Sequence, residues 1–224
     1  MVEYRIECEI MKLLKNPKFI YFDLRNVLLH EVGKTDLKIA QNLNIGVLEF
    51  ARIQRSIYQQ LYQKGYHKFL QRKTINEEIC FYEQFFREMC LLLQIPFSKE
   101  RIDILVTTKL QGTYELEPGA LALLQALFTR YPLGIISNGS AARRKYELKT
   151  NNIDKYFQII ILSFEVGFEK PDPRIFQLAA TSAKVDPKDI LFIDDRLRFL
   201  EGAVQAGIEN VVQVTTLTDG RAHV

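Results

Sequence analysis

The feature that most constrains this chain is a short apolar run that ends in a carboxylate. Residues 18–29 read Lys-Phe-Ile-Tyr-Phe-Asp-Leu-Arg-Asn-Val-Leu-Leu. An apolar run of this kind is typical of a central strand in a parallel sheet, which is buried on both faces. Such a strand places the residue that follows it, here Asp23, at the carboxyl edge of the sheet, where open α/β sheets bind their ligands. The stretch therefore predicts an α/β fold with Asp23 in its binding site.

The second half of the chain alternates between strand-like and helix-like segments. Strands are expected at residues 133–137, 157–162, 190–193 and 211–214, and helices at 118–130, 171–184 and 196–206, with a further helix running through Lys149. Repeated strand and helix units with continuous apolar strands predict a doubly wound, Rossmann-like parallel sheet. The first strand, which we expect to extend to Leu24, belongs to the same sheet.

The segment between the first strand and about residue 117 has helical periodicity and contains no convincing strand. Thr74-Ile75-Asn76-Glu77 has the form of a capping box, and the apolar residues that follow recur in steps of three and four as far as Leu93. About four helices of this kind can form a bundle of their own. We therefore predict an N-terminal lead-in at 1–17 with a small helix, an α/β core at 18–29 and 117–224, and a helical cap inserted at 30–116.

Composition limits the classes of function. Hydrophobic residues make up 47% of the 224 residues and charged residues 25%, which is the balance of a globular protein. The net charge is only +3, and the single basic triplet, Arg143-Arg144-Lys145, predicts a solvated helix face rather than a nucleic-acid site. We expect no nucleic-acid partner.

Three cysteines, Cys8, Cys80 and Cys90, cannot all pair and have no metal-binding spacing, so they are predicted to be reduced core residues. No apolar run approaches the length of a membrane span, and the first residues lack the pattern of an export signal. These observations predict a cytoplasmic protein with no membrane partner.

Polar residues of complementary kinds follow four of the predicted strands. They are Asp23, Ser137 with Asn138, Lys170 in the loop after the third strand, and Asp194 with Asp195. Parallel strands end at one edge, so these residues are expected to converge. A carboxylate nucleophile, a hydroxyl, an ammonium and a carboxylate pair suit phosphoryl transfer, with Mg²⁺ held by the pair. Because Lys170 alone does not neutralise three carboxylates, either Mg²⁺ or Arg25 must share that task.

The motifs at these positions resemble those of the haloacid dehalogenase (HAD) superfamily. They read Phe-Asp-Leu-Arg-Asn-Val-Leu at 22–28, Ile-Ser-Asn-Gly at 136–139, Glu-Lys-Pro-Asp-Pro-Arg-Ile-Phe at 169–176 and Phe-Ile-Asp-Asp-Arg at 192–196. The resemblance covers nearly the whole chain from Lys18, in the order that the superfamily uses. The helical insert resembles the cap of the subclass that includes phosphoglucomutase-like phosphatases, nucleotidases and dehalogenases.

The resemblance implies a role for each residue. Asp23 would be the nucleophile that forms an aspartyl-phosphate, and Ser137, Asn138 and Lys170 would bind the phosphate. Asp194 and Asp195 would hold Mg²⁺ together with the Asp23 carboxylate and the backbone carbonyl of Arg25.

Two positions depart from the superfamily pattern. Arg25 stands where its phosphatases have a second Asp, the acid and base for the leaving oxygen and the hydrolytic water, and a guanidinium with a pKa above ~12 cannot exchange that proton. Loss of general acid–base help typically slows a reaction by ~10²- to 10⁴-fold. Arg25 could instead bind a substrate carboxylate or phosphate, or pair with Asp194 or Asp195 in place of the metal. Phe199 stands where related sequences often have Asn.

Three functions remain open at this stage. The first is an attenuated hydrolase of a small phosphorylated or carboxylated molecule, such as an acyl phosphate, whose good leaving group needs little acid assistance. The second is a pseudoenzyme with a binding, regulatory or scaffolding role and a protein partner. The third is a dehalogenase-like hydrolase, although dehalogenases lack the paired carboxylates Asp194 and Asp195.

Overall fold

The computed structural model describes residues 16–63, 74–216 and 222–223, so most of the predicted lead-in, together with Cys8, lies outside the described residues. The chain divides into two compact units. One contains the chain as far as His30 and again from Glu115 onward, and the other consists of Glu31–Tyr114. The first unit is an α/β unit and the second is helical.

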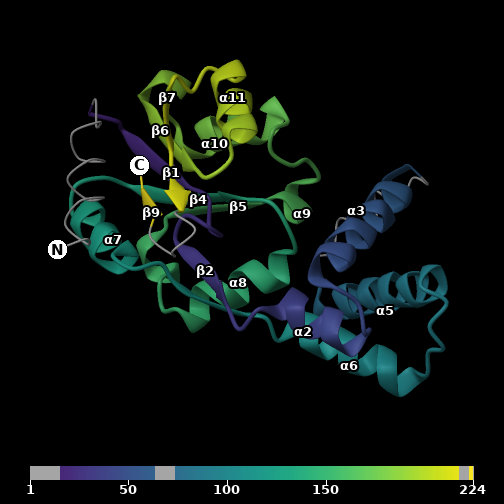
Figure 1. The fold of residues 1–224 in the computed structure, drawn as a ribbon. Coiled ribbons are helices and arrows are strands. Elements are labelled where there is room, and N and C mark those ends of the chain that lie inside the picture. Colours follow the sequence, from purple (N-terminus) through teal and green to yellow (C-terminus); the bar gives the residue numbers. More distant parts are fainter. Residues whose placement is uncertain (1–15, 64–73, 217–221, 224) are drawn as a thin grey trace. The chain divides into compact units, whose positions relative to one another are not determined.

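A parallel sheet of five strands forms the centre of the α/β unit (Figure 1). Its strands, in the order β5-β4-β1-β6-β7, are β5 Ile159–Leu162, β4 Leu133–Ser137, β1 Phe19–Phe22, β6 Ile190–Asp194 and β7 Asn210–Gln213. All four pairings between neighbours are parallel. The residues of β1, β4 and β6 are buried throughout, as their uninterrupted apolar sequences require. The predicted doubly wound sheet is confirmed.

Helices connect these strands. They are α7 Ala120–Phe128, α8 Ala141–Thr150, α9 Ser163–Val166, α10 Pro173–Ala183 and α11 Leu197–Gln205, with short 3₁₀ turns η1 Asp154–Tyr156 and η2 Pro187–Asp189. The two helices nearest the site begin at caps that the sequence supplies. The Ser140 hydroxyl accepts from Arg143 N at the start of α8, and Asp172 accepts from Arg174 N at the start of α10, with Pro173 in the first helical turn.

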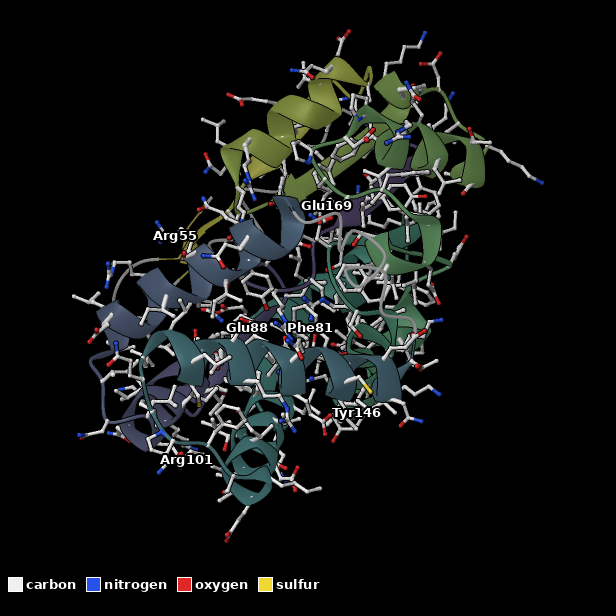
Figure 2. The ribbon with its side chains drawn as sticks, turned by 90° about the vertical axis from the view of Figure 1, so that its right-hand side faces the viewer. Arg55, Phe81, Glu88, Arg101, Tyr146 and Glu169 are labelled. Atoms are coloured by element: carbon white, nitrogen blue, oxygen red, sulfur yellow. The ribbon has the colours of Figure 1, made fainter. Side chains whose placement is uncertain are left out.

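The helical unit contains α2 Thr35–Asn42, α3 Val47–Gln63, α5 Ile75–Leu92 and α6 Lys99–Leu110. The predicted capping box is confirmed, since Thr74 Oγ1 accepts from Glu77 N at 3.3 Å and Thr74 N donates to Glu77 Oε2 at 2.9 Å. Phe81 of α5, labelled in Figure 2, packs against Tyr58 of α3 with ring centroids 5.9 Å apart. Cys90 is buried as predicted, but Cys80 is exposed, so the core assignment was wrong for Cys80.

The region predicted to lack strands contains two. β2 Leu29–Val32 and β3 Thr113–Leu116 pair with each other as the chain leaves and re-enters the α/β unit. The prediction failed because β2 is four residues long and only its first residue is buried, so it forms no continuous apolar run.

A second small pair, β8 Thr215–Thr216 with β9 Ala222–His223, is antiparallel. None of the helices among the described residues combines the length and the apolar character that crossing a membrane requires.

Candidate active site

The site lies at the point in the sheet where the chain stops adding strands on one side of β1 and begins to add them on the other. From β1 the chain proceeds to β4 and β5 on one side of the sheet and to β6 and β7 on the other, so β1 and β6 flank the crevice at which doubly wound sheets bind ligands. Asp23 immediately follows β1, and its backbone N–H donates to Ile193 O of β6 at 2.8 Å. Asp194 ends β6. The two strands therefore deliver their carboxylates to the same place.

Three carboxylates and one ammonium meet at this edge. Asp23, Asp194 and Asp195 each offer an oxygen, and these oxygens lie within 4.8 Å of one another. Lys170 Nζ lies 2.9 Å from Asp23 Oδ1 and 2.5 Å from Asp194 Oδ2. We name these four residues the acidic cluster. Lys170 is 1% exposed and Asp194 fully buried, so water screens their charges little.

The electrostatics of the acidic cluster are unfavourable without a further cation. Burial raises the pKa of the Asp194 carboxyl to about 7; the Lys170 ammonium opposes that rise, and the Asp23 charge adds to it. Closely spaced carboxylate oxygens are the ligands that Mg²⁺ takes in proteins. The donor set and its excess negative charge thus fit a divalent cation.

Two aromatic rings and a close backbone contact fix Lys170. Its Nζ lies 5.2 Å from the ring centroid of Phe192 and 5.0 Å from that of Phe199, distances at which a ring face attracts a cation. Phe199, the second departure from the superfamily pattern, is therefore a buried neighbour of the ammonium. At Gly202 of α11, a Cβ would lie 2.4 Å from Pro171 O. Glycine is needed there for α11 to approach the loop that carries Lys170.

Ser137 and Asn138, which follow β4, occupy different surroundings. Ser137 is buried at the end of the strand. The Asn138 amide donates from Nδ2 to Lys170 O and accepts at Oδ1 from Lys170 N, both at 2.9 Å. This reciprocal pair favours a role for Asn138 in holding the Lys170 loop in place, rather than its predicted role in binding phosphate. Ser163, which the sequence analysis did not single out, accepts from Gly139 N at 3.0 Å and so supports the loop after β4 that carries Asn138.

The turn after Asp23 is closed by its own backbone. Leu28 N and Leu29 N both donate to Leu24 O, at 3.0 and 2.9 Å. Asn26 has a φ of 62°, a left-handed conformation that Asn tolerates better than most residues. Its Nδ2 donates to Asp195 Oδ2 at 3.3 Å. Asn26 thus connects this turn to the acidic cluster, a contact that the sequence analysis did not predict.

A second charged cluster joins Arg25, in the turn after β1, to three residues of α8. Arg25 Nε donates to Glu147 Oε2 at 3.3 Å, and its Nη2 donates to Glu147 Oε1. Arg144 Nη1 lies 3.0 Å from Glu147 Oε2, and Arg143 Nε lies 3.4 Å from Oε1. We name these four residues the basic cluster. Burial by itself raises the pKa of Glu147, but Arg144, Arg25 and Arg143 outweigh it and hold that pKa below its ordinary value.

The basic cluster corrects one prediction. Arg144 is only 8% exposed, so the triplet at 143–145 is not a solvated face at this residue, although Lys145 is exposed. Its ion pair with Glu147 and its hydrogen bond to Asn138 O offset part of the cost of burying the guanidinium. The signal that could have revealed them is the spacing of three and four residues between the two arginines and Glu147, which places them on one side of a helix.

A sequence model of the haloacid dehalogenase-like hydrolases matches residues 17–207. The chain belongs to that family.

Curated relatives with similar sequences are mostly phosphatases. Pyrimidine 5'-nucleotidase YjjG of Escherichia coli is 33% identical over 93 residues, which is 41% of each chain. A glyceraldehyde 3-phosphate phosphatase of Methanothermobacter thermautotrophicus is 26% identical over 217 residues, covering 92% of this chain and 90% of that protein. The match to the nucleotidase thus spans about two fifths of that relative's length.

Solved structures share the fold at low identity. A HAD family enzyme of Bacteroides thetaiotaomicron, solved as an Asp-to-Ala mutant in complex with magnesium and inorganic phosphate, has a TM-score of 0.60 at 22% identity, covering 89% of this chain and 94% of that one. A 2-haloacid dehalogenase of Pseudomonas syringae has a TM-score of 0.61 at 19% identity, covering 88% and 86%. These likenesses confirm the predicted fold.

Proposed function

We propose that this chain hydrolyses a small phosphorylated molecule through a phosphoryl intermediate on Asp23. The observation that carries this proposal is the contact of Lys170 Nζ with both Asp23 Oδ1 and Asp194 Oδ2 at the edge of the sheet. A buried ammonium there orients the Asp23 carboxylate, and it is placed to attract a phosphoryl oxygen. The phosphatases among the relatives support the substrate class.

The chemistry follows in two displacements. An oxygen of Asp23 forms a bond to phosphorus while the bond to the leaving oxygen breaks, and the leaving group takes that electron pair. Water then attacks phosphorus, the acyl phosphate bond breaks, and the Asp23 carboxylate is regenerated with inorganic phosphate. Lys170 would face the charge that develops on the phosphoryl oxygens, and we assign Ser137, at the end of β4, to the predicted second contact with them.

A divalent cation fits the same site. Mg²⁺ would be held by oxygens of Asp23, Asp194 and Asp195 and by the backbone carbonyl of Arg25, and it would neutralise charge on the transferring group. The Asn26 contact to Asp195 and the Lys170 contact to Asp194 hold the acidic side chains in place for it.

Arg25 narrows the substrates that this site can turn over. Since its guanidinium cannot donate a proton at working pH, the leaving group must depart as an anion, which favours acyl phosphates over alkyl esters. We propose that the helical unit, Glu31–Tyr114, acts as the cap that selects among them.

Turnover with and without Mg²⁺ tests this function. Acetyl phosphate and p-nitrophenyl phosphate are expected to be hydrolysed with Mg²⁺, acetyl phosphate faster, and Asp23→Asn is expected to abolish both reactions. Absence of turnover of both substrates by the purified chain would contradict the proposal.

Arg25→Asp tests the missing proton carrier. This variant is expected to raise p-nitrophenyl phosphate turnover by at least about tenfold, on the scale of restored acid–base catalysis. No gain would show that the remaining residues do not assemble a working site.

A pseudoenzyme is the second candidate, and the ion pair of Arg25 with Glu147 favours it, because that contact gives Arg25 a structural role that requires no catalysis. The third, C–halogen hydrolysis, is tested by halide release from 2-chloropropionate, for which we expect none.

A further inference from the structure

Arg25 carries a positive charge unusually close to a proposed metal site. It follows Asp23 by two residues, so their Cα atoms lie within about 7 Å of each other. A guanidinium binds carboxylates bidentately and strongly, and three carboxylates meet at this edge. Without a restraint on its side chain, Arg25 would therefore compete with a divalent cation for the acidic cluster.

Glu147 supplies such a restraint. It accepts from Arg25 through both of its carboxylate oxygens, and its side chain is 4% exposed. Arg144 and Arg143, one turn earlier on α8, contact the same carboxylate and keep it ionised.

The carboxylate that holds Arg25 is itself anchored to the site. Arg144 Nη2 donates to Asn138 O at 3.0 Å, and the Asn138 side chain bonds the backbone of Lys170. A Cβ on Gly139 would lie 2.8 Å from Arg144 Nη2, so the loop after β4 packs closely on that guanidinium. The loop after β4, which also carries the predicted phosphate contacts, therefore fixes the position from which Glu147 holds Arg25.

We propose that Glu147 is a positioning residue that retains the Arg25 guanidinium on α8 and so leaves Asp23, Asp194 and Asp195 to bind a divalent cation. This inference rests on the proposed Mg²⁺ site. It predicts that Arg25 interferes with the metal only when Glu147 loses its charge, which makes the effects of the two residues interdependent.

Isothermal titration of the purified full chain with Mg²⁺ tests this dependence in four forms: unmodified, Glu147→Gln, Arg25→Gln and the double variant. Glu147→Gln is expected to weaken Mg²⁺ binding by at least about tenfold, the scale of one charged hydrogen-bonded pair. The double variant is expected to bind like Arg25→Gln, because the competing cation is gone. Glu165→Gln is the matched control. It removes an exposed ion pair with Lys145, which is in the same helix as Glu147, and it should leave Mg²⁺ binding unchanged.

Two results would overturn the inference: Mg²⁺ binding by Glu147→Gln equal to that of the unmodified chain, or a loss that persists in the double variant, which would indicate general damage to the fold. If Glu147→Gln does not fold, the equally uncharged Glu147→Met takes its place with the same two criteria. If the unmodified chain binds no Mg²⁺, the proposed metal site fails, and a crystal structure of Glu147→Gln decides separately. If Arg25 contacts the carboxylates of the acidic cluster in that structure, the proposal that Glu147 retains Arg25 is supported. If Arg25 still lies against α8, that proposal is refuted.

Discussion

The acidic and basic clusters have opposite composition and opposite electrostatic character. The first joins three carboxylates to one ammonium, and the second joins three guanidinium groups to one carboxylate. In the acidic cluster, burial raises the pKa of Asp194, whereas in the basic cluster the arginines lower the pKa of Glu147. In the acidic cluster the charged form of Asp194 is thus destabilised. In the basic cluster the charged form of Glu147 is stabilised.

This difference separates a functional arrangement from a supporting one. Unfavourable charge that a protein retains at a sheet edge, with the pKa of one carboxyl shifted toward neutral pH, is typical of a binding or catalytic site. A carboxylate surrounded by guanidinium groups is satisfied within the fold. We therefore expect substitutions in the acidic cluster to change activity most, and substitutions in the basic cluster to act through Arg25.

Removal of the ammonium is expected to have the largest effect. Lys170→Met keeps the length of the side chain but leaves Asp23 and Asp194 without the cation between them. Turnover of acetyl phosphate is expected to fall by about 10³-fold, the scale of losing one preorganised electrostatic contact. Lys145→Met, which removes an exposed lysine, is the control and should retain full turnover. Retention of activity by Lys170→Met would place the functional charge elsewhere.

The pH dependence of stability comes next. Burial raises the folded-state pKa of Asp194 to about 7, well above the ordinary aspartate value of ~3.9. Between these values the folded state binds more protons than the unfolded state, so the free energy of unfolding falls as pH rises. In EDTA it should decrease between pH 5 and 7 by up to ~1.4 kcal/mol per pH unit.

Urea denaturation at several pH values measures this slope. Asp194→Asn should flatten it, because Asn does not titrate, and Mg²⁺ should reduce it in the unmodified chain. An unchanged slope in Asp194→Asn would assign the dependence to another group, such as Glu117, whose pKa burial also raises.

Overpacking behind the acidic cluster gives a smaller effect. In Gly202→Ala the new Cβ would lie 2.4 Å from Pro171 O, a backbone atom that cannot move by itself. We expect a loss of ~1–3 kcal/mol in the free energy of unfolding, together with reduced turnover as the Lys170 loop shifts. Thermal melts and turnover check both. A variant that loses stability but keeps full turnover would show that the loop position is not critical.

The smallest effect is expected at an exposed ion pair between α8 and α9. Lys145 and Glu165 form an ion pair whose side chains are 54% and 35% exposed. Exposed pairs contribute ~0–1 kcal/mol, so Glu165→Gln should shift the melting temperature by only a few degrees at most. A large shift would mean that the basic cluster extends to this pair.

Much of the sheet could be predicted from the chain, because β1, β4 and β6 are continuous apolar runs and buried parallel strands require such runs. The capping box at Thr74 was equally readable, since it depends on residues three apart. The β2 and β3 pair could not be predicted, because short, half-exposed strands are defined by their partner rather than by their own pattern.

The sequence by itself determined which residues stand at the strand ends. Asp23, Lys170, Asp194 and Asp195 could be expected to meet, because parallel strands share one edge whatever the details of packing. Only the tertiary structure decided the partner of Arg25. Glu147 lies 122 residues away on α8. The partner of a side chain that spans such a distance in sequence depends on where the neighbouring helix packs, and no local sequence pattern encodes that position.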